Sequence, residues 1–223
     1  MSKRVLVVAA HADDESLGCA GTIARHIALG DQVSVVFMTD GVSSRRDSEI
    51  DDQKSRQTSA HNAMSVLGVS EVRQFSFPDN QMDTVPLLSV AHAVEGILEE
   101  TTPQIIYTHF PNDLNVDHGI THRAVLTACR PQLTSSVKEI YLFEVLSSSE
   151  WGSKVLAPFL PQLVVDISPY WALKVQAIAC YQEEMRTFPH SRSIECVEAL
   201  ATFRGATHGM EKAEAFHIER VLV

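Results

Sequence analysis

The sequence predicts an α/β protein built on a mostly parallel β-sheet with helices on both faces. Two observations support this class. Short apolar runs rich in β-branched residues alternate with longer helical patterns along the 223 residues, which is typical of parallel strands joined by helices. Acidic residues and histidines follow two of these runs directly, as at the ligand-binding edge of an open sheet. Since no internal repeat or low-complexity segment interrupts the alternation, we expect a single domain over residues 1–223.

A β-α-β unit opens the chain. Residues 5–9 (VLVVA) form an apolar run of strand length, and four titratable residues follow within the segment 11–15. The apolar residues of the segment 17–27 are spaced for one face of a helix, and Gly30 ends that pattern. A second apolar run, residues 33–38, completes the unit.

The same alternation continues to the C-terminus. We expect further strands at residues 72–77, 105–109, 139–145 and 163–167. We expect helices at about residues 51–67, 87–100, 120–129 and 169–185, and a last helix that follows Ser193 and ends near Phe203. The polar segment 43–52 is expected to form a loop beside the site, and the residues after Phe203 a short ending.

Composition excludes several classes of partner. The formal net charge is −10 and the longest basic run is Arg45–Arg46, so duplex nucleic acid and anionic membranes are poor partners. The four cysteines are scattered without a CxxC pair, which argues against a disulfide framework or a zinc ribbon. The N-terminus lacks the order of a signal peptide, and the apolar run at Val5 is too short to span a bilayer. We expect a cytoplasmic protein.

Two clusters of chemically active residues follow predicted strands. His11 and Asp14 are three residues apart at a strand-to-helix corner, and His118 lies just before a second helix. Two imidazoles and a carboxylate suit a catalytic Zn²⁺ with one open position, where a bound water has a pKa of about 7. Asp13 is then free to act as general base. Asp117 is placed to orient His118.

Each of these residues also has a purely structural interpretation. Aspartates after strands often cap helices, and a lone histidine is more often a packed or solvated side chain than a ligand. Capping alone does not readily explain two His/Asp clusters that each follow a predicted parallel strand. The pattern therefore favours a metal site.

The same residues carry a resemblance to a known family. His11–Glu15 (HADDE) resembles the HPDDE motif of the PIG-L/LmbE-like zinc-dependent deacetylases, which remove acetyl from N-acetylglucosamine-type sugars. Asn115–His118 (NVDH) is similar to the second motif of that family, HxxDH. The resemblance continues in chain order through Thr39–Gly41, Phe77–Asn80 and Pro189–Ser193.

This resemblance implies a Rossmann-like α/β fold and a set of roles. It implies that the zinc ligands are His11, Asp14 and His118, and that the general base is Asp13. The chain departs from the family pattern at Ala12, which replaces a proline, and at Asn115, which replaces a histidine that helps to stabilise the tetrahedral intermediate.

The second departure, at Asn115, removes the histidine that the family pattern provides as a donor to the oxyanion of the tetrahedral intermediate. Asn115 can donate through its amide, but it is shorter than histidine and uncharged. We therefore expect His190, in the turn before the last helix, to supply the donor. The alternative is that His190 is an exposed turn residue.

Further polar residues near the predicted strand ends are candidates for binding substrate. Arg56 is expected to face the site, where it would hold a phosphate or a sugar carboxylate, whereas Arg45 and Arg46 are expected to be solvated loop charges. His122 lies on the same helix face as His118 but is not required as a ligand. Four residues are expected to bond sugar hydroxyls or, alternatively, to form turns: Asp79, Asn80, Asn112 and Asp113.

We therefore expect a cytoplasmic zinc-dependent hydrolase that removes acetyl from an N-acetylated amino sugar or its conjugate. Its partner would be a small amino-sugar molecule, and it could form a homo-oligomer. Two alternatives stay open: an amidase that cleaves a larger thiol-sugar conjugate, and a non-catalytic sugar-binding protein with a residual metal site. A nicotinamide cofactor is not expected, because the turn after the first strand lacks GxGxxG spacing.

Overall fold

The computed structural model describes residues 2–41, 50–133 and 135–223, with the side chains of residues 50–53 left out. Its centre is one seven-stranded sheet in the order β3-β2-β1-β4-β5-β7-β6. The first five strands are parallel, and β7 runs antiparallel to both β5 and β6. The strands are β1 (Arg4–Ala9), β2 (Gln32–Thr39), β3 (Glu71–Phe77), β4 (Ile105–His109), β5 (Glu139–Phe143), β6 (Leu163–Asp166) and β7 (Ala213–Val221).

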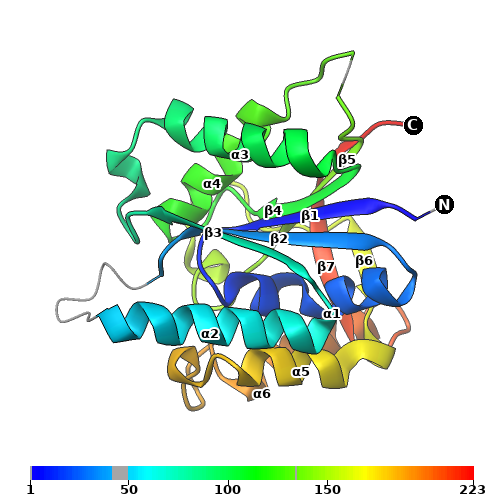
Figure 1. Ribbon diagram of the computed structural model, residues 1–223. Coiled ribbons are helices and arrows are strands. Elements are labelled where there is room, and N and C mark those ends of the chain that lie inside the picture. The colour runs from blue at the N-terminus through cyan, green and yellow to red at the C-terminus, as the bar shows by residue number, and fades with distance from the viewer. Residues whose placement is uncertain (1, 42–49, 134) are drawn as a thin grey trace.

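Helices cover both faces of this sheet, as predicted. In Figure 1, α1, α2, α5 and α6 lie on one face, while α3 and α4 lie on the other. Their bounds are α1 (Asp14–Ala28), α2 (Ile50–Leu67), α3 (Leu87–Thr101), α4 (Val116–Ala128), α5 (Trp171–Ala179) and α6 (Ile194–Ala206). Among the described helices, none is long and apolar enough to cross a membrane.

The packing of strand β1 explains why the sequences of the central strands are unbroken apolar runs. Val5, Val7 and Ala9 pack into one hydrophobic cluster, and Leu6 and Val8 pack into a second one on the opposite face. Because helices bury both faces of a parallel sheet, neither face of β1 needs polar residues. The polar residues that follow β1 therefore lie at the edge of the sheet.

Two predicted helices have different bounds in the structure. The fourth helix begins at Val116 rather than at residue 120, because the Asn115 carboxamide oxygen caps it by accepting the Asp117 N–H at 2.8 Å. The helix predicted for residues 169–185 is shorter: α5 ends at Ala179. Beyond it, Tyr181 is buried and its hydroxyl donates to Glu15 at 2.9 Å, so a tertiary contact redirects the chain here.

The C-terminal strand β7 was not predicted. Residues 213–216 (AEAF) combine small residues with an acidic one, a pattern of low strand propensity. In the structure Glu214 is nevertheless buried, because it accepts bonds from the Gly21 and Thr22 N–H groups. Most of the polar segment 43–52, including Arg45 and Arg46, lies outside the described residues.

Candidate active site

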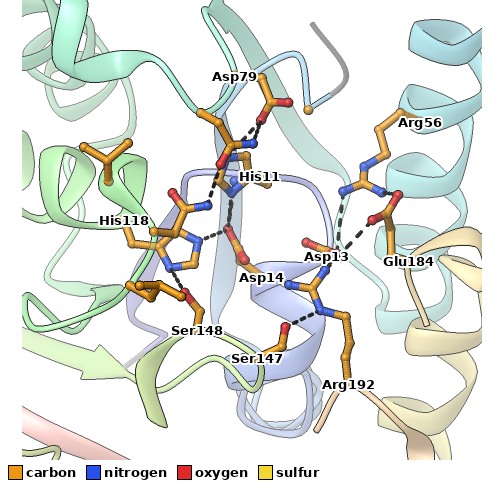
Figure 2. Close-up of a pocket in the computed structure, with 15 residues that line it drawn as sticks. His11, Asp13, Asp14, Arg56, Asp79, His118, Ser147, Ser148, Glu184 and Arg192 are labelled. Atoms are coloured by element: carbon orange, nitrogen blue, oxygen red, sulfur yellow. Dashed lines mark hydrogen bonds and ion pairs between the residues drawn. The ribbon is translucent and has the colours of Figure 1, made fainter. Parts of the chain in front are cut away.

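A cavity of about 460 Å³ lies at the carboxyl ends of the parallel strands. The corner after β1 supplies His11, Asp13 and Asp14, and the first turn of α4 supplies His118. Parallel strands end together at one edge of a sheet, so two segments about a hundred residues apart meet there. Figure 2 shows these side chains converging on one pocket.

The corner after β1 separates two adjacent carboxylates. Asp13 has a φ of 131°, a conformation that few non-glycine residues adopt. The Glu15 carboxylate holds it there by accepting the Asp13 N–H at 3.0 Å. As a result, Asp14 points toward His11 and His118, whereas Asp13 points toward the opposite side of the pocket (Figure 2).

Asp14 lies between two imidazoles. Its Oδ2 atom is 3.2 Å from His11 Nδ1 and 3.3 Å from His118 Nε2. All three side chains are buried, and their ligand atoms lie within 4.8 Å of one another. This is a two-histidine, one-carboxylate set of the kind that holds a catalytic divalent metal.

In each imidazole, the outer nitrogen, which is the one that faces away from Asp14, contacts a further carboxylate. His11 Nε2 lies 3.0 Å from Asp117 Oδ2 and 3.1 Å from Asp79 Oδ1. His118 Nδ1 lies 3.0 Å from Asp113 Oδ1. A neutral imidazole that donates from its outer nitrogen presents a lone pair at its inner one, which is how carboxylates orient metal-binding histidines.

This arrangement corrects one part of the sequence prediction. Asp117 contacts His11 and not His118, and the carboxylate on His118 is that of Asp113. The reason is local: Asp117 is on the first turn of α4, where its carboxylate also accepts the N–H groups of Asn80 and Met82 at 2.6 and 3.0 Å. Asp113 therefore orients a histidine, a role different from the predicted contact with sugar hydroxyls.

The electrostatics of the site fit a bound cation. Burial lowers the pKa of the His118 imidazole, but Asp14 and Asp113 outweigh this effect and raise the pKa to about 9. The same negative potential that holds a proton there attracts a divalent ion. A second possible group, His11 with Asp79 and Asp117, fits less well, because the Asp117 oxygens are already occupied by backbone N–H groups.

Asp13 lies beside this set with partners of its own. Its Oδ2 atom is 3.0 Å from Arg192 Nη1 and 3.5 Å from Arg56 Nη2. Burial raises the pKa of the Asp13 carboxyl above its usual value, and the two guanidiniums offset only part of that rise. A carboxylate with a raised pKa is a stronger base, as a general base at neutral pH must be.

The remaining predicted residues divide into two groups. Asp79, Asn80, Asn115 and Arg56 line the cavity. Asn112 does not, because its amide donates to the carbonyls of residues 153 and 157 and so holds a neighbouring loop.

Neither of the two other histidines considered joins the metal-ligand set. His190 is exposed, its Nδ1 accepts the Arg192 N–H at 3.0 Å, and it is not among the described residues that line the cavity. His122 is buried, and its Nε2 lies 3.8 Å from Glu219 Oε2. A role for His190 in catalysis therefore stays a prediction.

Several residues of the site were not predicted from the sequence. Arg192 and Glu184 come from the C-terminal part of the chain and line the cavity. Arg192 belongs to the turn that carries the family resemblance, which was a usable signal, whereas nothing in the sequence singled out Glu184. His109, the last residue of β4, stacks on His118 with ring centroids 3.9 Å apart, and burial holds its pKa well below the usual value.

Several known proteins resemble this chain. The uncharacterized deacetylase YaiS of Escherichia coli (strain K12) is 29% identical over 182 residues, which cover 79% of this chain and 89% of that protein. A probable N-acetyl-α-D-glucosaminyl L-malate deacetylase of Bacillus cereus is 26% identical over 192 residues, covering 82% and 84%. The N,N′-diacetylchitobiose deacetylase structure from Pyrococcus horikoshii has a TM-score of 0.79 at 22% identity, covering 98% of this chain and 84% of that chain, which shows a shared fold.

A family-level match includes the metal-ligand set itself. The sequence pattern of the PIG-L family, described as GlcNAc-PI de-N-acetylase, matches residues 6–129. That segment runs from β1 through α4 and therefore contains His11, Asp14 and His118. Because the match covers more than half of the chain and agrees with the two motifs, the chain belongs to the PIG-L (LmbE-like) family.

Proposed function

We propose that this protein is a metal-dependent hydrolase that removes the acetyl group from an N-acetylated amino sugar or its conjugate, of the N-acetylglucosamine type. The observation that carries the proposal is a buried carboxylate, Asp13, beside a two-histidine, one-carboxylate set. Family membership and the names of the relatives give the same reaction class.

His11, Asp14 and His118 would hold the metal, and Zn²⁺ suits their nitrogen and oxygen donors. When bound, the metal supplies Lewis-acid polarisation of the acetyl carbonyl and activation of a water molecule. The carboxylates of Asp117 and Asp113 keep the two imidazoles in the orientation that binding requires.

Asp13 moves the proton. It accepts a proton from the water whose oxygen attacks the acetyl carbon, and it returns that proton to the amine nitrogen as the C–N bond breaks. The products are acetate and the free amino sugar. Arg192 and Arg56 hold the Asp13 carboxylate in place for both transfers, at 3.0 and 3.5 Å.

We infer that Asn115, rather than His190, donates to the oxyanion. It lines the cavity, whereas His190 does not. Its carboxamide oxygen caps α4, and its Nδ2 donates to Asn80 Oδ1 at 2.9 Å. The carboxamide is therefore held in one orientation in the cavity wall, next to Asn80, which would also contact the sugar.

Acetate release measures the proposed reaction directly. Metal-free protein would be incubated with N-acetylglucosamine, N,N′-diacetylchitobiose and N-acetylglucosaminyl conjugates, with and without added Zn²⁺. The proposal predicts acetate release that requires metal. Cleavage of only larger amides would indicate the amidase alternative, and sugar binding without any release would indicate a binding protein.

A further inference from the structure

Two arginines line the cavity beside the general base. Arg56 extends from α2, and Arg192 comes from the loop before α6. A guanidinium is the side chain best suited to bind a carboxylate or phosphate of a ligand, because its donors match two oxygens at once. The state of these two arginines therefore bears on whether the substrate carries an anionic group.

Acidic residues of the protein already occupy both arginines. Arg56 Nη1 forms an ion pair with Glu184 Oε1, and Arg56 Nη2 faces Asp13 Oδ2 at 3.5 Å. Arg192 Nη1 lies 3.0 Å from Asp13 Oδ2 and 3.9 Å from Glu184 Oε2. Its Nε donates to Ser147 at 2.9 Å. Figure 2 shows Glu184 and Asp13 between the two guanidiniums.

Glu184 is the acid in this group that the hydrolysis does not need. It is only 8% exposed and lines the same cavity. On the described wall of the cavity, Asp14 and Asp79 face the histidines that would hold the metal, so Asp13 and Glu184 are the carboxylates that face the two guanidiniums. A substrate carboxylate entering beside Asp13 would meet like charge and would have to displace Glu184 from Arg56.

We propose that Glu184 makes this site select uncharged amino-sugar conjugates over conjugates that carry a carboxylate. This inference rests on the proposed deacetylase function and deepens it by naming the substrate class. Glu184 acts as a specificity-determining residue: it neutralises the arginines that would otherwise attract an anionic aglycone, and it repels that aglycone itself.

A matched pair of substrates isolates the effect of charge. The probes are N-acetyl-α-D-glucosaminyl L-malate and its dimethyl ester, which share one skeleton and differ by two negative charges. In the zinc-loaded wild type, kcat/KM should favour the ester by about tenfold or more, since like charges facing each other in a binding site are strongly unfavourable. Glu184→Gln keeps the shape, removes the charge and should shift that ratio toward the malate conjugate by about tenfold.

The adjacent residue provides the control. Glu183 lies in the same short turn but is exposed, so Glu183→Gln makes the same change in net charge outside the cavity. It should leave the ratio unchanged. Because a ratio of two substrates cancels any loss of active protein, partial unfolding of a variant does not affect the comparison.

Binding measurements distinguish a failure of the proposed selectivity from a failure of the proposed deacetylase function. Calorimetric titration with the deacetylated compounds, glucosaminyl malate and its dimethyl ester, should show the same preference and the same shift in Glu184→Gln. Equal affinity for the two, or a ratio that Glu184→Gln does not change, would overturn the selectivity. Absence of acetate release from every acetylated sugar would instead refute the deacetylase function, whatever the binding ratio.

Discussion

Asp13 and Asp14 are neighbours in sequence with different surroundings. Asp14 lies 3.2 and 3.3 Å from two imidazole nitrogens, whereas Asp13 contacts two guanidiniums. We predict that Asp13→Asn retains bound metal and loses turnover by about 10²- to 10⁴-fold, the usual cost of removing a general base. Asp14→Asn should instead weaken metal binding. Metal content by elemental analysis and acetate release would be measured together, and similar behaviour of the two variants would refute the division of roles.

The oxyanion donor is tested by two substitutions. Asn115→Ser can still cap α4 through its hydroxyl but removes the carboxamide from the wall of the cavity. We expect it to lower kcat by about 10²-fold, with metal content unchanged. His190→Ala should have a smaller effect, because His190 lies outside the described lining of the cavity. A larger loss in His190→Ala would return the role to the histidine.

A buried ion pair between Lys174 and Glu214 connects α1, α5 and β7. Helix α1 is interrupted at Cys19, whose φ is −148°. Lys174 of α5 donates to the Leu17 carbonyl at 2.8 Å and to Glu214 of β7 at 2.6 Å. Glu214 in turn accepts from N–H groups that follow the interruption. The pair therefore satisfies both sides of the break in the helix that begins at the metal site.

We predict that Lys174→Met lowers the free energy of unfolding by about 3–5 kcal/mol, because Glu214 is left buried with an unpaired charge. The double variant Lys174→Met/Glu214→Gln should recover part of this loss. Lys212→Met is the control, since Lys212 pairs with the exposed Glu198 at 2.8 Å, and should cost less than about 1 kcal/mol. Urea denaturation measures all three, and equal losses for both lysines would contradict the account.

His26 links α1 to its surroundings in a pH-dependent way. Its Nδ1 is 2.7 Å from Asp31 Oδ2, and its Nε2 is 3.0 Å from the Tyr107 hydroxyl. Burial lowers the pKa of His26, and Asp31 offsets only part of this effect. In the unfolded chain His26 takes up a proton at a pH of about 6.5, whereas in the folded protein it does so only at a lower pH. Through His26, acidification below about 6.5 therefore favours unfolding.

We therefore predict that His26 lowers the free energy of unfolding as the pH decreases from about 6.5 toward its depressed pKa, a contribution seen as the difference between wild type and a His26 variant. Replacing His26 with glutamine should remove this contribution, so the variant should lose less stability than the wild type between pH 6.5 and 5. His61 is exposed, and His61→Gln should leave the decline unchanged. Urea titrations between pH 7.5 and 5 would test this, and an equally steep decline in His26→Gln would show that another group is responsible.

At the scale of the whole molecule, the sequence was most informative where burial is complete. The central strands are apolar on both faces, so their positions and the parallel sheet were predictable from the apolar runs and their alternation with helical patterns. Strand β7 was not, because its buried Glu214 depends on partners nearly two hundred residues away. The local motifs likewise indicated His11, Asp14 and His118, whereas Glu184 enters the site only through tertiary folding.

The carboxylates that contact His11 and His118 were likewise not predictable from the sequence alone. Adjacency in sequence suggested that Asp117 orients His118, but a helix directs neighbouring side chains to different sides. Asp117 therefore contacts His11, across the pocket, and Asp113 orients His118 from the preceding loop. Such pairings depend on the relative placement of β1 and α4, which the sequence alone does not specify.

The central claim is that a metal held by His11, Asp14 and His118 enables hydrolysis of an acetylated amino sugar. The most direct test measures zinc content and acetate release on the same samples of wild type and His118→Ala, with circular dichroism to establish that both are folded. We predict about one zinc per wild-type chain, as three protein ligands imply, with metal-dependent release. A folded His118→Ala should lose most of both. Full metal content or undiminished release in that variant would contradict the account.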